Sequence, residues 1–301
     1  MFISELLDNP AEALRSLLIA LPGILLALSC HEAAHGYIAY RCGDPTAKLC
    51  GRLTLNPLRH VNPMGLICML LIGMGWATPV PVNPNNFRHG RRDDLRVSMA
   101  GITANLALFL LCFLLITALC FTALSMLPKY DIYEYYTSDV GSCLVEYSGD
   151  TVFVFENGGY IDSESLFSFS SGMYYYTSDN GGKLTFESCV IEPALGSFAA
   201  VLYEMLASCM LINLSLAVFN LLPIPPLDGY HLLNDLLLKK NLFVKQKTAR
   251  IASTVLIILI VVGNYNSDLN IISKAISWVH TTALDSFTSL THLLAQAIGI
   301  I

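Results

Sequence analysis

The stretch that decides the fold is HEAAHGYIAY, residues 31–40, which stands near the end of an apolar run covering about 13–40. His31 and His35 are four positions apart, so on a helix their rings project from one face and can bind one metal ion. Glu32 lies beside them and can act as a general base. Because ionisable groups are costly inside an apolar span, a metal site is favoured over two histidines packed in a core.

The composition is that of a membrane protein. Hydrophobic residues make up 54% of the 301 positions and charged residues 13%, whereas a soluble domain has about 25% charged residues. Apolar stretches of spanning length, which is about 20 residues for a helix, occur at 13–40, 97–127 and 194–222, and a shorter one at 251–263. Four crossings are therefore expected.

The distribution of charge predicts the orientation of these spans. Basic residues gather in three short segments, 41–59, 88–96 and 239–250, and such loops remain cytoplasmic. The segment 129–192 instead carries eleven acidic residues and two lysines. We therefore expect the basic loops to be cytoplasmic and 129–192 to be extracytoplasmic.

Two segments are expected to contain β structure. Residues 49–82 are apolar in part but lie between two basic loops, and their short alternating pieces and turn formers predict a re-entrant β element. Alternation in 128–193, for example TVFVFE at 151–156, predicts a small β-rich insertion. Cys143 and Cys189 bracket this insertion and could pair or remain free thiols.

The expected organisation has four parts. Residues 1–127 hold the first two core spans, 128–193 the insertion, and 194–250 the third core span with a cytoplasmic ligand loop. The last part, 251–301, is expected to hold an additional span and an amphipathic C-terminal helix. The fold class is thus an α-helical polytopic membrane protein with a three-helix catalytic core, a re-entrant β element and an extracytoplasmic β-rich insertion.

A catalytic zinc ion has three protein ligands and one open position, so a third ligand is needed. The extended soluble pattern would place glycine at position 38 and histidine at 41, where this chain has Ile38 and Arg41, and no glutamate follows before residue 134. The strongest candidate is Asp228 in NLLPIPPLDGYHLLND (220–235), where three prolines break the helix. His231 is a rival ligand, and a simple exit turn is the alternative interpretation.

These motifs together resemble a known family. His31-Glu-x-x-His35 and Asn220-x-x-Pro223-x-x-x-x-Asp228-Gly229 look like the two signature motifs of the site-2 protease family of intramembrane zinc metalloproteases, particularly its smaller bacterial and archaeal members. The segment 75–106 is also similar, although the family usually has Ala-Gly-Pro where this chain has Ala-Gly-Ile at 100–102.

The resemblance implies roles for six residues. Three would be zinc ligands and one the catalytic base, while two asparagines near the active centre would contact the substrate or the developing oxyanion. Interhelical hydrogen bonds explain these two asparagines equally well. The three ligands would be His31, His35 and Asp228, and the base would be Glu32. The two asparagines are Asn105 and Asn220.

The expected function is that of a zinc-dependent intramembrane endopeptidase, which cleaves transmembrane segments of membrane-protein substrates in regulated intramembrane proteolysis. Its expected partners are such a substrate and the lipid bilayer, not nucleic acid, and its expected location is the prokaryotic plasma membrane. The alternatives are a non-proteolytic membrane zinc-binding protein, a transporter, or a structural subunit whose histidines pack. Substrate identity and oligomeric state stay open.

Overall fold

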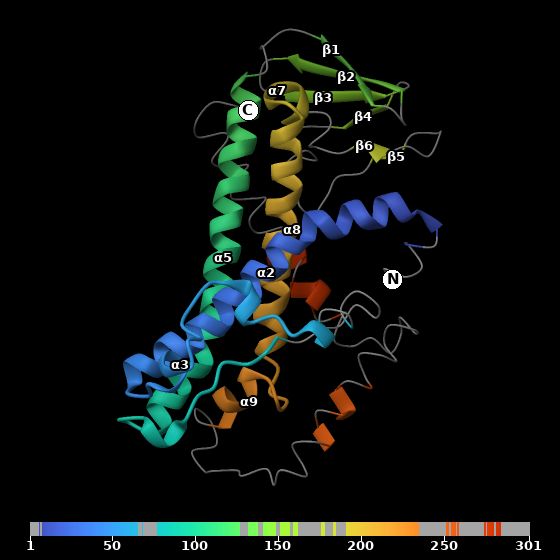
Figure 1. The fold of residues 1–301 in the computed structure, drawn as a ribbon. Helices are drawn as coiled ribbons and strands as arrows, with labels where there is room; N and C mark the ends of the chain where they lie inside the picture. Colours follow the sequence, from blue (N-terminus) through green and yellow to red (C-terminus); the bar gives the residue numbers. More distant parts are fainter. Residues whose placement is uncertain are drawn as a thin grey trace. The chain divides into compact units, whose positions relative to one another are not determined.

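A computed structural model gives the fold of the chain (Figure 1). It describes residues 6, 8–65, 68, 77–126, 132–137, 141–148, 151–156, 159–161, 176–177, 183–184, 191–234, 251–252, 254–256, 258, 274, 276–279 and 281–283. Contacts divide the chain into two compact units. One comprises Met1–Leu110 and Cys209–Ser277, and the other Leu111–Ser208 and Trp278–Ile301.

Three long helices dominate the described part of the chain: α2 (Pro10–Cys42), α5 (Arg91–Met126) and α8 (Ser197–Asn220). Among the described residues, these three are long and apolar enough to cross a membrane. The first three expected spans are thereby confirmed as helices. Most of the fourth, at 251–263, lies outside the described residues.

The ends of α2 follow from its sequence. Asn9 caps the first turn, its side chain accepting a hydrogen bond from the backbone N–H of Glu12, and Pro10 takes the first helical position, where a missing N–H costs nothing. The helix stops at Gly43, whose φ of 112° is left-handed. The 33-residue length is ample for a tilted span.

Small residues bring the helices of the first unit together. A Cβ added to Gly23 of α2 would lie 2.9 Å from the Cα of Cys209 in α8, so the two backbones are almost in contact there. Ala27 and Ala217 are completely buried, whereas Leu18 is 59% exposed. Close approach through small residues, with large apolar side chains facing outward, is the packing expected of helices in lipid.

The connection between α2 and α5 is mostly irregular. It contains α3 (Thr46–Leu49) and two short 3₁₀ turns, η1 (Pro57–Arg59) and η2 (Pro84–Asn86). Within 49–82 the described residues form one isolated antiparallel bridge, Val61 to Ala77, rather than a strand. The re-entrant β element is therefore not confirmed, and 66–67 and 69–76 lie outside the described residues.

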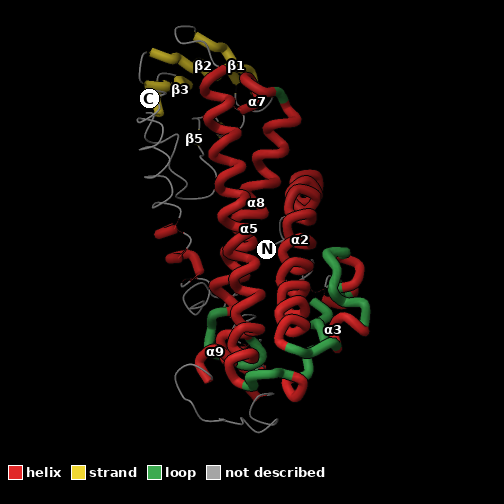
Figure 2. Tube along the Cα trace, turned by 90° about the vertical axis from the view of Figure 1, so that its left-hand side faces the viewer, coloured by secondary structure: helices red, strands yellow, loops and turns green. Residues whose placement is uncertain are grey.

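After α8 the chain turns through 221–227 and enters α9 (Asp228–Leu233). Figures 1 and 2 both show α9 and α3 at the same end of the first unit, beside the start of α5. Segments nearly two hundred positions apart in the sequence thus meet at one end of this unit.

The second unit contains α7 (Glu192–Leu195) and short antiparallel strands. The strands β1 to β4 form one sheet in sequential order, and β5 pairs with β6. Their bounds are β1 Ile132–Thr137, β2 Gly141–Ser148, β3 Thr151–Glu156, β4 Gly159–Ile161, β5 Tyr176–Thr177 and β6 Lys183–Leu184. Much of 128–193, including Cys189, lies outside the described residues, so the β-rich insertion and the cysteine pairing stay predictions. The same holds for the amphipathic C-terminal helix.

Candidate metal centre

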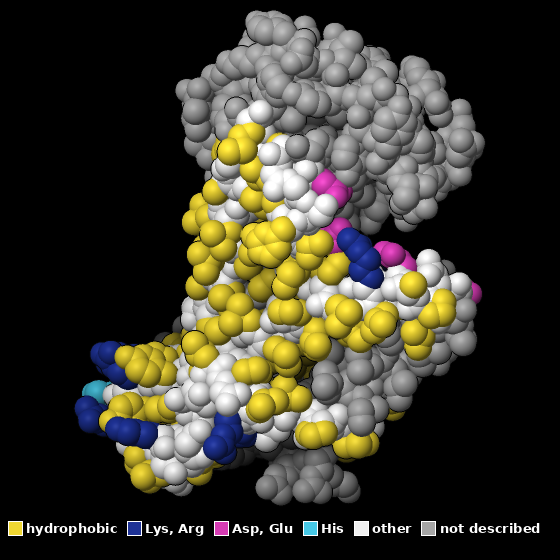
Figure 3. Space-filling model, turned by 45° about the horizontal axis from the view of Figure 1, so that its top comes forward, with side chains coloured by type: hydrophobic (Ala, Val, Ile, Leu, Met, Phe, Trp, Pro, Cys, Tyr) yellow, Lys and Arg dark blue, Asp and Glu magenta, His cyan; other side chains and the backbone are white. Residues whose placement is uncertain are grey.

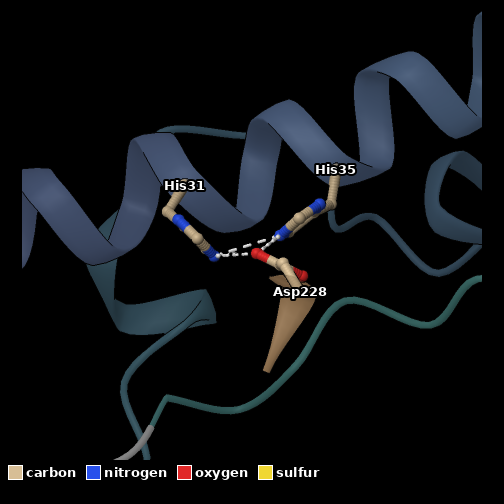
Figure 4. A group of neighbouring side chains, drawn as sticks. All are labelled: His31, His35 and Asp228. Atoms are coloured by element: carbon tan, nitrogen blue, oxygen red, sulfur yellow. Dashed lines mark hydrogen bonds and ion pairs between the residues drawn. The ribbon is translucent and has the colours of Figure 1, made fainter. Parts of the chain in front are cut away.

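The two histidines of the HEAAH stretch face one another on α2. Their rings meet edge to face with centroids 4.6 Å apart, and their Nε2 atoms are 3.0 Å apart. This is the arrangement expected for side chains one helical turn apart. Figure 4 shows both rings projecting from the same side of α2 toward Asp228.

Asp228 comes to the histidines because the backbone folds tightly after α8. A Cβ on Gly229 would lie 2.3 Å from the carbonyl oxygen of Leu221, so glycine is required where α9 packs back on the end of α8. Oδ2 of Asp228 is then 3.3 Å from the Nε2 atoms of both His31 and His35. The expectation that these three side chains converge is met by the geometry.

The three donor atoms have the spacing of a metal site. Within the described residues, His31, His35 and Asp228 form the group whose ligand atoms all lie within 4.8 Å of one another. Bonds of 2.0–2.2 Å in a tetrahedral zinc site place donors roughly 3.3 Å apart, and the observed separations are 3.0, 3.3 and 3.3 Å. Oδ2 of Asp228 is buried and receives no hydrogen bond, which leaves it available to a cation.

The charge of the site suits a cation as well. Burial alone would raise the pKa of Asp228, but the adjacent His31 and His35 rings outweigh it and hold the pKa below its ordinary value. Asp228 is therefore ionised at neutral pH. A bound metal would displace the ring protons that face this carboxylate, and two neutral imidazoles with one carboxylate are a donor set that zinc prefers.

A stripe of residues on α5 contacts the two imidazoles. Nδ1 of His35 lies 2.7 Å from the carbonyl oxygen of Val97. A carbonyl can only accept, so Nδ1 carries the proton and Nε2 keeps its lone pair for a metal. The side-chain amide of Asn105 lies 3.2 Å from Nδ1 of His31 and is completely buried.

Gly101, midway along this stripe, permits the contact. A Cβ there would lie 2.5 Å from both His31 Cε1 and His35 Nε2. Sequence reasoning missed the contacts of Val97 and Gly101 with the imidazoles. Their spacing of four residues, continued at Asn105, was the available signal, because positions four apart share one face of a helix.

Glu32 points toward the connection between α2 and α5. Its Oε2 accepts a hydrogen bond of 2.7 Å from the backbone N–H of Val80. The carboxylate is thus outside the donor group but next in sequence to a member of it. That is a suitable position for a base that accepts a proton without binding the metal.

The remaining candidates lie elsewhere. The rival ligand His231 makes an ion pair with Asp94 (Nδ1 to Oδ2, 3.4 Å) and is not part of the donor group. Nδ2 of Asn220 donates to the carbonyl oxygen of Leu216 in its own helix at 2.9 Å. The substrate contacts expected of Asn105 and Asn220 stay predictions.

Two histidines on a helix long enough to cross a bilayer, and an aspartate at the start of the short helix α9, converge on one point and define a membrane protein with a His₂Asp metal centre. The sequence profile of Peptidase family M50 matches residues 19–263. The chain belongs to this family, the site-2 proteases, which confirms the resemblance noted in the motifs.

Curated relatives agree with this assignment. YwhC of Bacillus subtilis, by name a candidate zinc metalloprotease, is 32% identical over 213 residues, which is 71% of this chain and 66% of YwhC. Rip2 of Mycolicibacterium smegmatis and Rip2 of Mycobacterium tuberculosis, named in the same way, are 33% and 35% identical over 31% of this chain and 38% of their own lengths. The matched part thus spans slightly less than two thirds of YwhC. No solved structure matches the chain significantly.

Proposed function

We propose that the protein is a zinc-dependent intramembrane endopeptidase that hydrolyses a peptide bond in a transmembrane segment of a membrane-protein substrate. The observation that carries this proposal is the triangle of His31, His35 and Asp228 donor atoms, whose sides of 3.0, 3.3 and 3.3 Å suit one tetrahedral ion. Family membership and the names of the relatives support zinc and peptide hydrolysis. When bound, zinc acidifies water and polarises a carbonyl group.

Each residue of the proposed active site then has a defined role. His31, His35 and Asp228 would hold the ion, and three protein ligands are the number found in catalytic zinc sites. Glu32 accepts the proton from the attacking water and passes it to the leaving amine. No covalent bond between enzyme and substrate is needed, because water is the nucleophile.

The helix α5 orients the two imidazoles. The carbonyl of Val97 keeps the proton of His35 on Nδ1. If His31 binds through Nε2, its Nδ1 carries a proton, and Asn105 must present its oxygen to that proton. Rotating the amide of Asn105 by 180° achieves this and gives a partner to Oδ1, which is otherwise buried without one. We therefore assign Asn105 to the orientation of His31.

The topology proposed is that of a prokaryotic plasma-membrane protein with its basic loops inside and 129–192 outside. In Figure 3 most of the visible Lys and Arg side chains gather at the lower left, with hydrophobic side chains beside them, and a further basic side chain lies next to acidic ones at the right. Basic loops are retained on the cytoplasmic side. Protease added to spheroplasts should cut within 129–192 and spare 88–96, and the reverse pattern would refute this orientation.

The segment 49–82 is proposed as a re-entrant element that borders the active centre. A helical substrate must unwind before its amide bonds are accessible. Hydrogen bonds between its backbone and an extended segment of the enzyme would then replace the helical hydrogen bonds that it loses. The bridge of Val61 to Ala77 supports extended backbone at these two positions within the element.

The decisive experiment measures zinc content and cleavage of a single-span substrate in proteoliposomes. Glu32→Gln should keep zinc and lose about 10²–10⁴-fold in rate, whereas Asp228→Ala should lose both. Glu12→Gln is the matched control, because it makes the same chemical change on the same helix at an exposed position. Normal cleavage by Glu32→Gln would refute the mechanism.

Two further functions are tested by the same preparation. A transporter would move zinc into sealed vesicles, and this movement would depend on Asp228 but not on Glu32. A non-proteolytic zinc-binding protein would retain zinc without cleaving any substrate. Transport is not expected, because the described ionisable groups of the site converge on one point rather than lining a path. A non-proteolytic protein is not expected either, because the family and the names of the relatives indicate peptide hydrolysis.

A further inference from the structure

We propose that the backbone N–H of Val80 is a positioning group that holds Glu32, the general base of the proposed function, in its working orientation. This inference rests on the proposed function and extends it. The carboxylate of Glu32 comes from α2, whereas Val80 lies 48 positions later in the connection to α5. Their hydrogen bond of 2.7 Å has the length of a charge-assisted bond.

The sequence around Val80 leaves few backbone donors. Residues 78–84 read TPVPVNP, and proline has no backbone N–H. Val80 therefore carries the amide hydrogen that stands between Pro79 and Pro81. The two rings also restrict the backbone, because each proline fixes its own φ and biases the preceding residue toward extended conformations. The direction of this N–H is thus strongly constrained.

Neighbouring segments hold the Val80 backbone in place. The guanidinium of Arg52 donates hydrogen bonds of 3.2 Å to the carbonyl oxygens of Thr78 and Pro79, the two residues before Val80. The N–H of Thr78 donates to the carbonyl of His60 at 2.7 Å. These contacts tie 78–80 to the earlier part of the same connection.

Helix α2 allows the segment to approach closely. Gly36 lies four positions after Glu32 and so on the same face of α2. A Cβ there would be 2.8 Å from Leu53 Cδ2 and 3.0 Å from Val80 Cγ1. The side chain of Val80 is only 8% exposed. The absence of a side chain at Gly36 therefore brings Val80 within reach of the base one turn away.

The bond restrains one carboxylate oxygen and leaves the other to take the proton. A base must lie within about 2.6–3.2 Å of the atom that it deprotonates, and a displacement of about 1 Å can reduce a rate by about 100-fold. Glu32 has three rotatable bonds and needs such a restraint. Loss of the Val80 N–H should therefore lower kcat without changing how zinc or substrate binds.

Val80→Pro removes this N–H and leaves the three ligand side chains untouched. The expected result is a fall in kcat of about 10–100-fold, with KM within about twofold and zinc content unchanged. Val82→Pro is the comparison variant, since it makes the same exchange two residues later but keeps the Val80 N–H, and its fall in kcat should be the smaller of the two. In a Glu32→Asp background, where the carboxylate is drawn back by one methylene, Val80→Pro should add little further loss.

Arg52 offers a second test if Val80→Pro does not fold. Arg52→Met removes the guanidinium bonds to Thr78 and Pro79 and should lower kcat several-fold at constant zinc content, while Arg52→Lys should restore part of the loss. Wild-type kcat in Val80→Pro, or in Arg52→Met where only that variant folds, would overturn the assignment. Loss of zinc in these variants, or an undiminished effect in the Glu32→Asp background, would overturn it too.

Failure of this assignment differs from failure of the proposed function. If the wild-type protein binds zinc and cleaves the substrate while Val80→Pro does the same at the normal rate, only the role of Val80 is wrong. If the wild-type protein neither binds zinc nor cleaves, the proposed function is wrong and the assignment falls with it.

Discussion

Gly101→Ala is the most direct probe of how α5 supports the metal centre. The added methyl carbon would lie 2.5 Å from both His31 Cε1 and His35 Nε2. Non-bonded heavy atoms are at their optimum at about 3.5–4.0 Å, so roughly 1 Å must be recovered by rotating the rings or displacing α5. Zinc sites tolerate only about 0.2 Å in their bond lengths.

The expected loss of zinc affinity in Gly101→Ala can be worked out in two independent ways. Overpacking of this kind costs about 1–3 kcal/mol, and changes next to metal ligands weaken metal binding by about 10–100-fold. Since tenfold in affinity is about 1.4 kcal/mol, the two ranges overlap. We expect Gly101→Ala to bind zinc about 10–100-fold more weakly, measured by competition with a fluorescent zinc chelator on the purified protein.

Gly23→Ala is the matched control for this experiment. It adds the same methyl group to a helix crossing, at 2.9 Å from the Cα of Cys209, but eight positions before His31 on α2, which is about 12 Å along the helix. It should lower the thermal stability while the folded fraction keeps its zinc affinity. Equal zinc affinity in Gly101→Ala and wild type, or equal loss in both variants, would refute the argument.

Three further predictions follow from the contacts described above. Asn105→Leu should weaken zinc binding about 10–100-fold, while Asn105→Asp, which keeps an acceptor for Nδ1 of His31, should bind zinc nearly as well as wild type in the same chelator assay. Gly229→Ala should lower zinc content and cost about 1–3 kcal/mol of stability, because its methyl would meet the backbone of Leu221; metal analysis and thermal unfolding measure both. Asp44→Asn should cost about 1–3 kcal/mol, because the buried carboxylate of Asp44 accepts hydrogen bonds from the loop that leads to α5.

The Asp44 prediction has a defined pH dependence. Burial alone would raise the pKa of Asp44, but hydrogen bonds from Asn83, Thr46 and Asn86 outweigh it and lower the pKa. The unfolded chain then binds this proton more tightly, so the stabilisation is complete above the unfolded value of about 3.9 and is lost as the pH falls through the lower folded value. Thermal unfolding between pH 2 and 5 should show a steeper acid loss in wild type than in Asp44→Asn.

Each of these predictions can fail in a distinct way. Equal zinc affinity in Asn105→Leu and Asn105→Asp would show that Nδ1 of His31 does not need an acceptor. Normal zinc content in Gly229→Ala would show that the turn after α8 adjusts without moving Asp228. Parallel pH profiles for wild type and Asp44→Asn would show that this carboxylate is not preferentially ionised in the folded state.

The sequence predicted the parts of the protein that rest on local patterns. Apolar runs of sufficient length predicted α2, α5 and α8, and the spacing of His31 and His35 predicted two donors on one helical face. Asp228 was found because prolines and a glycine break the chain beside an acidic residue. These features depend on residues that are close in sequence.

Contacts between distant segments could not be predicted in this way. Nothing local indicates that the N–H of Val80 faces Glu32, or that Gly101 must lack a side chain because two rings occupy the space. The connection at 49–82 was expected to form β structure from alternation and turn residues. Hydrogen bonds from side chains such as Arg52 and the fixed φ of the prolines instead determine the backbone of its described residues. These residues form one isolated β bridge.

Because the metal ligands are divided between α2 and α9, a bound ion would also hold these two helices together. A bound metal would join two stretches of backbone separated by most of the chain, like a removable cross-link, and would stabilise the folded state in proportion to the logarithm of its free concentration. Chelation should therefore loosen the turn at 221–227 before it unfolds α2. The concentration of free zinc in the cell would then determine how long the protein stays folded as well as its catalytic activity.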